Sequence, residues 1–339
     1  MAELVYDLAV VGGGPSGLIC GLTGVTGIPI NPPRHFTGIV VDAHEIASFA
    51  RYGKLRITHR WSYNGGKLLR HLENEVAASN LVVRPHTRVM AAEFGSGFQR
   101  LLTTTGEIRA RQVALCVGFF PYGFLARYPE RVRISFSPPS IEAPHLPARS
   151  GDLVLVLGRG GATVGLAAEL QRLRPELSFR LIHDDAREAT TLAGGISCLH
   201  GNPIRFDVDS EGVSIDLKTA TGGMDSQRGH FLLVDYDAYT RSTQVTDFLS
   251  GSGVTRRGGY IVADQSGSTG VDGVVAAGNI VTPVSGLLTA LDTGFQAGLT
   301  VYDRLHVERF GKPALVFPWL PRTGLKTHPL YSPTPEDEP

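Results

Sequence analysis

The chain has 339 residues, which is enough for two domains with separate hydrophobic cores. Hydrophobic residues make up 42% of it, a share that is typical of a globular protein and excludes intrinsic disorder. Its 32 basic residues balance 32 acidic residues, so no charge excess favours a nucleic acid or a membrane surface. We therefore expect a small-molecule substrate, and neither nucleic acid nor membrane as a partner.

The first residues, LVYDLAVVGGG, enter a strand almost at once, with neither a basic leader nor a cleavage site of small residues. No apolar stretch reaches the ~20 residues of a membrane-spanning helix. These features predict a cytoplasmic protein. Cys20, Cys116 and Cys198 are too far apart in sequence for a CxxC pair or a zinc ribbon, and we predict that they are reduced and mostly buried thiols.

The strongest chemical signal is VVGGGPSGL, in which Gly12, Gly14 and Gly17 have the spacing G-x-G-x-x-G between an apolar strand and a helical run. Such a turn lets a pyrophosphate approach the backbone at the positive end of the helix dipole. Asp42 closes the next strand, where a ribose hydroxyl needs an acceptor, although it lies 25 residues past Gly17 rather than ~20. The pattern predicts a nucleotide site; the alternative is a turn with a purely structural role.

The following segments alternate between helical and extended patterns. A helical pattern over 64–79 precedes short strands, and residues 119–150, rich in proline and arginine, predict a crossing between domains. A second strand, glycine turn and helix begin at Leu153. A third block, 258–305, contains two strands and a long helix without a glycine turn, so we expect it to complete the first domain's sheet.

These motifs carry a resemblance. GGGPSGL, then ALCVG at 114–118, the second glycine turn at 158–163 and GVDGVVAAGNI before the last helix occur in the order seen in thioredoxin-reductase-like flavoproteins, over most of residues 3–306. The resemblance implies an α/β fold with two Rossmann-like three-layer domains, the second inserted into the first. The implied boundaries are 1–118 and 246–339 for the FAD-binding domain and 119–245 for the inserted one.

The resemblance also implies a homodimer and bound FAD. Asn279 departs from the family's usual Gly-Asp pair, but an amide can still hydrogen-bond a ribityl hydroxyl. The residues implied to contact FAD are Gly12, Gly14, Pro15, Ser16, Gly17, Asp42, Val89, Gly118, Gly278, Asn279, Leu288, Thr289 and Ala290.

The chain lacks the redox motif of the family that it resembles. Where thioredoxin reductases carry CxxC, ahead of the second glycine turn, it reads ISFSPPSIEAP. We therefore expect no electron transfer from flavin to a protein disulfide, which argues against a thioredoxin reductase and against a dithiol oxidase.

The second glycine turn leaves two interpretations open. Gly158, Gly160 and Thr163 fit G-x-G-x-x-(small), so the backbone could take a pyrophosphate. The next strand ends in His183, Asp184 and Asp185 where NADPH-using relatives carry His-Arg-Arg, and carboxylates there disfavour a 2′-phosphate and suit a ribose diol. An NAD(H) site and a vestigial fold, with both acids as solvated loop residues, are equally consistent with this pattern.

Two segments are candidates for contact with a flavin ring. The stretch YGKLRITHRWSYNGG carries Lys54, Arg56, His59, Arg60, Trp61 and Tyr63, and His59 is a weak candidate for an acid or base; the alternative is loop packing. The C-terminal tail carries aromatic candidates in a position resembling the added segment of ferredoxin–NADP reductases. They are Phe317, Trp319, His328 and Tyr331.

Three functions follow from these features. The first is a FAD-dependent oxidoreductase, an oxidase or dehydrogenase, in which a small organic substrate reacts directly at the flavin. The second is an electron-transfer enzyme like the ferredoxin or flavodoxin reductases, although the neutral net charge does not favour docking of an acidic carrier. The third is a flavin-binding scaffold without catalytic activity.

Overall fold

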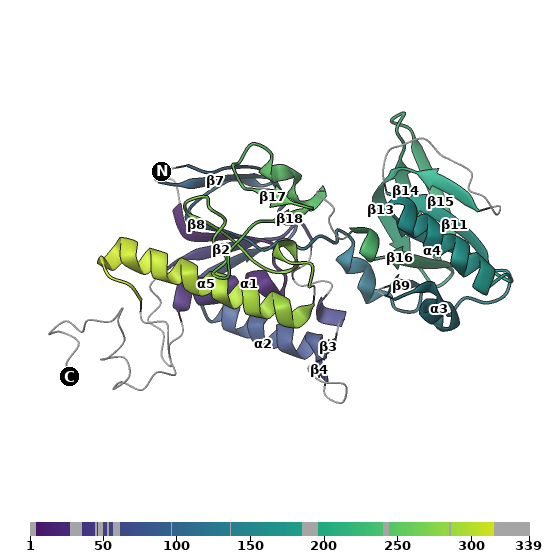
Figure 1. Ribbon diagram of the computed structural model, residues 1–339, viewed down its shortest axis with the longest axis horizontal. Helices are drawn as coiled ribbons and strands as arrows, with labels where there is room; N and C mark the ends of the chain where they lie inside the picture. Colours follow the sequence, from purple (N-terminus) through teal and green to yellow (C-terminus); the bar gives the residue numbers. More distant parts are fainter. Residues whose placement is uncertain are drawn as a thin grey trace.

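The computed structural model describes residues 5–27, 36–44, 46, 50–52, 54–56, 62–95, 97–135, 137–184, 196–239, 244–284 and 286–314, without the side chains of 52, 54–56 and 62–63. Its elements form two domains, each with its own parallel sheet (Figure 1). In the part of the chain so described, no helix is long and apolar enough to cross a lipid bilayer.

The first domain is built on a seven-stranded sheet in the order β5-β2-β1-β8-β7-β6, with β19 also paired to β8. The ladder β5-β2-β1-β8-β19 is parallel, whereas β6, β7 and the first half of β8 form an antiparallel meander. The strands are β1 (Val5–Val11), β2 (Gly38–Val41), β5 (Leu81–Arg84), β6 (Val89–Glu93), β7 (Gln99–Thr103), β8 (Gly106–Leu115) and β19 (Val274–Ala276).

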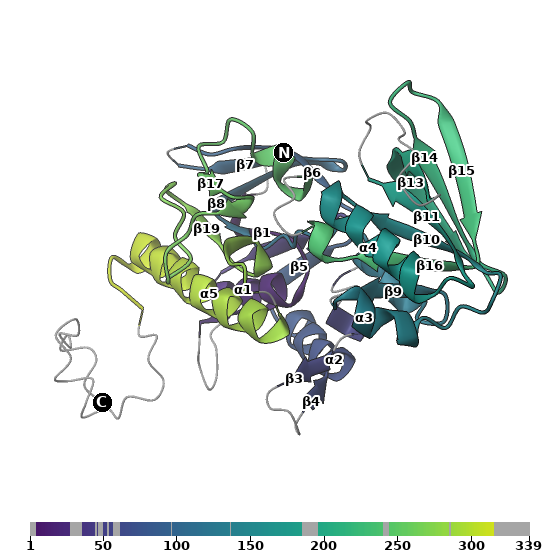
Figure 2. The ribbon, with the colours of Figure 1, turned by 45° about the vertical axis from the view of Figure 1, so that its right-hand side comes forward.

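Three helices cover one face of this sheet, and the meander lies toward the opposite side (Figure 2). Two short hairpins, β3–β4 and β17–β18, lie outside the main sheet. The helices are α1 (Pro15–Thr26), α2 (Gly65–Ala77) and α5 (Leu287–Phe310), and the hairpin strands are β3 (Lys54–Arg56), β4 (Ser62–Asn64), β17 (Arg256–Arg257) and β18 (Tyr260–Ile261).

The second domain has an all-parallel sheet in the order β12-β11-β10-β16-β9. Alternate residues of β10 face opposite layers, as strand geometry requires: Val154 and Val156 pack toward α4, and Leu155 and Leu157 toward the antiparallel sheet β13-β14-β15. The elements are β9 (Val132–Ser135), α3 (Pro139–Glu142), β10 (Leu153–Gly158), α4 (Gly160–Leu173), β11 (Ser178–His183), β12 (Ser197–His200), β13 (Asn202–Val208), β14 (Val213–Lys218), β15 (Met224–Gly229) and β16 (Phe231–Asp235).

The predicted fold class is confirmed, because two parallel α/β sheets alternate along the chain and β19 returns to the sheet of the first domain. One detail of the prediction is wrong. Residues 119–150 are more than a crossing, since β9 within them pairs with β16 as an edge strand of the second sheet. The domain boundaries 1–118, 119–245 and 246–339 stay a prediction.

Helices α1 and α5 pack with their backbones in direct contact. A Cβ atom on Gly294 of α5 would lie 2.5 Å from the carbonyl oxygen of Ser16, and one on Gly298 would lie 2.8 Å from that of Cys20. Any larger residue at either position must push the helices apart, because these neighbouring atoms belong to the backbone and cannot rotate away. The contact therefore fixes the position of the two helices relative to each other.

Replacing Gly298 with alanine tests this contact. We expect Gly298→Ala to lower the free energy of unfolding by about 1–3 kcal/mol through overpacking, measured by chemical denaturation. The matched control is Gly165→Ala in the middle of α4, where a Cβ meets no atom within 4 Å. This control should be neutral or stabilise by up to ~1 kcal/mol, because alanine favours the helix. Equal losses in both variants would contradict the proposed contact.

Candidate functional site

The first glycine turn has the geometry that its spacing predicts. Gly12 has φ 105°, and a Cβ there would lie 2.6 Å from the carbonyl oxygen of Cys116. A Cβ on Gly17 would lie 1.8 Å from the carbonyl oxygen of Gly12, so only glycine lets α1 start this close to β1. Around Gly14, by contrast, no atom of the described residues other than its two chain neighbours lies within 4 Å of a Cβ position. The turn is closed on the protein side and open where a phosphate would approach.

Asp42 stands beside this turn, directly after β2. Its Oδ2 accepts a hydrogen bond from the backbone N–H of Gly13 (2.6 Å), and its Oδ1 accepts one from that of His44 (2.8 Å). Burial raises the pKa of Asp42, while these two backbone hydrogen bonds lower it. The residue is only partly buried, and each carboxylate oxygen has further acceptor capacity, so a ligand hydroxyl can still bind it.

The carboxyl ends of β8 and β19 lie at the same edge of the first sheet as the glycine turn and Asp42. Gly278, which follows β19, has φ 86°, and a Cβ there would lie 3.0 Å from Oγ of Ser16. Its N–H donates to the hydroxyl of Thr293 on α5 (2.8 Å). The Ser16 hydroxyl is 4% exposed and has no hydrogen-bond partner among the described residues, a state that buried polar groups rarely show without a ligand or water.

Asn279 and the start of α5 border this edge. Oδ1 of Asn279 accepts a hydrogen bond from the backbone N–H of Gly286 (3.2 Å), which caps α5. Tyr236, at the exit from the second domain, also hydrogen-bonds the Asn279 side chain, and burial raises the pKa of Tyr236. In the first turn of α5, Leu288 is 56% exposed and Ala290 is buried.

The structure thus brings most of the sequence-predicted residues to one edge of the first sheet, at the carboxyl ends of its parallel strands. Val89 is buried at the start of β6, two residues after Thr87, whose N–H donates to the backbone oxygen of Asp42 (2.7 Å). Gly118 is exposed just after β8. Apart from Val89, which lies on β6, the predicted residues follow the ends of β1, β2, β8 and β19 or begin α1 and α5: they are Gly12, Gly14, Pro15, Ser16, Gly17, Asp42, Gly118, Gly278, Asn279, Leu288, Thr289 and Ala290.

Two residues near this edge were not predicted from the sequence. Ile46 lies over the turn, because a Cβ on Gly13 would meet its Cδ1 at 2.3 Å. His86 has φ 54°, a conformation uncommon outside glycine, and its N–H donates to the backbone oxygen of His44 (3.2 Å). The segment RPHT, with its turn-forming proline, was the available signal for His86; nothing in the sequence marks Ile46.

The second glycine turn is built differently from the first. Here Gly160, not the first glycine, has positive φ (67°). The Thr163 hydroxyl accepts a hydrogen bond from the N–H of Arg159 (2.9 Å) and donates one to Oδ2 of Asp235 (2.7 Å). A Cβ on Gly158 would meet the Thr163 side chain at 2.5 Å, so this side chain fills the inside of the turn.

The interpretation of Asp184 as a solvated loop acid is wrong. Asp184 is fully buried, its Oδ2 accepts a hydrogen bond from the Tyr122 hydroxyl (2.7 Å), and the Arg159 guanidinium lies 3.4 Å away. Burial raises the pKa of Asp184, whereas the Tyr122 hydrogen bond and the Arg159 charge lower it. His183 is buried too, with its ring 4.8 Å from that of His200. Asp185 lies outside the described residues.

Two segments connect the domains: one lies between β8 and β9, and the other follows β16. Their rings and that of Phe206 form a cluster that we call the aromatic joint. The Tyr122 ring lies 5.6 Å from that of Tyr239 and 5.1 Å from that of Phe206, and Phe206 lies 5.7 Å from Phe124. Phe124 in turn lies 5.7 Å from the ring of His44, beside the first carboxylate. The joint consists of Phe119, Phe120, Tyr122, Phe124, Phe206, Tyr236 and Tyr239.

The cysteines are buried, as predicted. Cys20 and Cys116, far apart in sequence, are nevertheless neighbours. A hydrogen bond with Cys116 and burial hold the pKa of Cys20 well above its ordinary value, which disfavours the reactive thiolate.

The predicted flavin-ring contacts cannot be placed. His59, Arg60, Trp61 and the tail aromatics Phe317, Trp319, His328 and Tyr331 lie outside the described residues, as do the side chains of Lys54, Arg56 and Tyr63. Their roles stay predictions.

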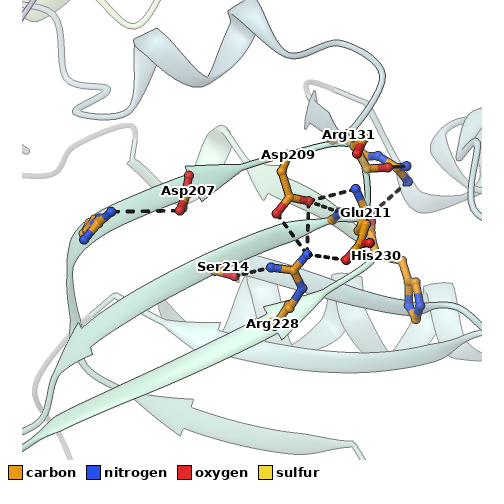
Figure 3. Close-up of polar contacts among 10 residues, drawn as sticks. Arg131, Asp207, Asp209, Glu211, Ser214, Arg228 and His230 are labelled. Carbon is orange, nitrogen blue, oxygen red and sulfur yellow. Dashed lines mark hydrogen bonds and ion pairs between the residues drawn. The ribbon is translucent and has the colours of Figure 1, made fainter.

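A polar groove of about 850 Å³ lies at the opposite, amino-terminal end of the second sheet (Figure 3). Several of its polar groups contact one another or a neighbouring residue: Asp209 lies 3.0 Å and Glu211 3.4 Å from the Arg228 guanidinium, and Arg131 donates to the backbone oxygens of Ser210 and His230. These contacts tie the β13–β14 turn to the strand starts, which is a structural role.

Comparison with known proteins agrees with this architecture. The structure of Lactococcus lactis thioredoxin reductase in its FR conformation superposes with a TM-score of 0.51 and 17% identity, over 89% of this chain and 99% of that one. The fold is that of thioredoxin reductase. The predicted resemblance is thereby confirmed for the fold.

The sequence comparison gives two distant relatives with curated names. The chain is 24% identical to the F subunits of two alkyl hydroperoxide reductases, that of Xanthomonas campestris pv. phaseoli over 336 residues and that of Pseudomonas aeruginosa over 322 residues. These matches cover 92% and 90% of this chain but only 59% of each relative's length. No protein-family model matches the chain.

The environment of His44 makes stability depend on pH. Burial lowers the pKa of His44 from its ordinary value near 6.5, against the opposing charge of Asp42. The unfolded chain then binds the proton more readily, so the free energy of unfolding should fall as pH drops through 6.5, by at most ~1.4 kcal/mol per pH unit from this group. Chemical denaturation between pH 7.5 and 5.5 should show a flatter dependence for His44→Asn; an unchanged slope would contradict this assignment.

Proposed function

We propose that the protein is a FAD-dependent oxidoreductase in which a small organic substrate reacts directly at the flavin. The observation that carries this proposal is the edge formed by Gly14, Ser16 and Asp42, where an open turn, an unpartnered buried hydroxyl and a partly exposed carboxylate lie together. This donor and acceptor set fits the adenosine and pyrophosphate part of a dinucleotide.

Each group has a distinct part in holding the cofactor. The amino terminus of α1, with Pro15 in its first turn, would face the pyrophosphate with free N–H groups and the positive end of the helix dipole. Asp42 would accept from the adenosine ribose, and Asn279 would hydrogen-bond the ribityl chain. FAD, when bound, supplies two-electron redox chemistry.

The names of the relatives support an oxidoreductase. The two curated relatives are named as subunits of an alkyl hydroperoxide reductase, and the structural neighbour is named a thioredoxin reductase. This chain, however, contains no CxxC sequence, and its three cysteines are buried. A direct reaction between substrate and flavin is the route that these features favour. The homodimer and the cytoplasmic location stay predictions.

The cofactor is tested by its release. The purified protein should be yellow and should release FAD, not FMN, on heating, because the first turn and Asp42 serve only a cofactor with an adenosine pyrophosphate. Asp42→Ala should weaken FAD binding by about 10- to 100-fold, since a hydrogen bond to a charged group contributes about 1.5–3 kcal/mol. Asp209→Ala, in the polar groove, is the matched control and should leave FAD affinity unchanged. Release of a stoichiometric amount of FMN, or the absence of any flavin after reconstitution, would contradict the proposal.

The dispensability of thiols is tested by replacing Cys20, Cys116 and Cys198 together with alanine. The variant should lose about 1–3 kcal/mol of stability in total, because all three sites are buried. Reduction of its flavin by dithionite, and turnover once a substrate is identified, should persist. A folded, flavin-loaded variant without turnover would instead make the neighbouring pair Cys20 and Cys116 a redox centre.

A further inference from the structure

The two domains of this chain carry equivalent carboxylates in opposite environments. Asp42 directly follows β2 and Asp184 directly follows β11, so each is the first residue after the second strand of its glycine-turn unit. Asp42 is partly exposed, and among the described residues its carboxylate accepts hydrogen bonds from the backbone N–H groups of Gly13 and His44. Asp184 is 0% exposed and bonded to side chains. Only the first carboxylate is accessible to a ribose hydroxyl.

The residue that makes this difference occupies the second position of the turn. In the first turn that residue is Gly13, whose backbone N–H reaches Asp42 and which has no side chain to intrude. In the second turn it is Arg159, whose guanidinium lies 3.4 Å from Asp184 and 5.4 Å from the centre of the Tyr239 ring. The guanidinium thus lies between turn and carboxylate, the place where a dinucleotide puts its adenosine ribose.

Both crossings between the domains pack around the same carboxylate. Tyr122, on the entering crossing, donates to it at 2.7 Å. Tyr239, on the leaving crossing, places its ring 5.6 Å from that of Tyr122 and 5.4 Å from the Arg159 guanidinium. A ribose could reach Asp184 only after Arg159 and Tyr122 had left it, and their departure would break the contact that ties the crossings to the second sheet. Leaving a buried carboxylate without these partners is costly.

We propose that Arg159 and Tyr122, with the Tyr239 ring packed against both, hold Asp184 as a brace between the domains, and that this brace takes the place of a nicotinamide dinucleotide in the second domain. The inference rests on the proposed function and deepens it, because it makes the organic substrate, rather than NADH or NADPH, the source of the flavin's electrons. Thr163 reinforces it by binding the N–H of Arg159 and so holding the arginine backbone at the turn.

Calorimetric titration of the full chain with NADH and with NADPH tests the brace. The unaltered protein should bind neither with a Kd below about 1 mM. The double variant Arg159→Gly, Tyr122→Phe frees the Asp184 carboxylate and should gain NADH affinity by at least tenfold. Adding Asp184→Asn to it should remove the gain. Arg228→Gly, which breaks an exposed ion pair in the same domain, is the control and should gain nothing.

Two results would overturn the brace. One is binding of either nucleotide by the unaltered protein with a Kd well below 1 mM. The other is a folded double variant that gains no affinity. Should the double variant melt below the assay temperature, Arg159→Ala alone, checked by circular dichroism, should show a smaller gain of NADH binding, and its absence counts equally against the proposal. Because these titrations report on the second domain, they are independent of whether the first domain holds FAD.

Discussion

Backbone contact between α1 and α5 is the constraint on which the rest of the first domain depends. Gly294 and Gly298 allow α5 to lie against the backbone of α1, and Gly17 allows α1 to lie against the turn after β1. Because the helices cannot separate, their amino termini and the ends of β2, β8 and β19 converge at one edge of the sheet. The positions of the first glycine turn, the Ser16 hydroxyl and the Asp42 carboxylate depend on this packing.

The aromatic joint connects this edge to the second domain. At one end, His44 donates its N–H to Asp42 and packs its ring against Phe124; at the other, Tyr122 donates to Asp184. Tyr236 of the same joint reaches Asn279 beside the first glycine turn. The two equivalent carboxylates have therefore come to serve different purposes. In our proposal, one borders the FAD site, and the other holds the segments that carry the chain between domains.

Local spacing explains what the sequence could predict. The first glycine turn, Asp42 and the second strand–turn–helix unit are each defined within a few dozen residues, and the structure places them as expected. Burial of Asp184 escaped prediction because its partner Tyr122 lies 62 residues away, and the pairing of Cys20 with Cys116 escaped it for the same reason. Strand β9 was missed because its short segment lacks a strong period and is an edge strand that pairs only with β16.

The central claim is that the flavin takes its electrons from an organic substrate and not from a nicotinamide nucleotide. Absorbance of the flavin-loaded protein, followed without oxygen after addition of excess NADH or NADPH, tests it most directly. Our account predicts that the visible flavin band persists with either nucleotide and disappears with dithionite. Bleaching by NADH or NADPH at a rate typical of enzymes, on the order of 1 s⁻¹ or faster, would contradict it.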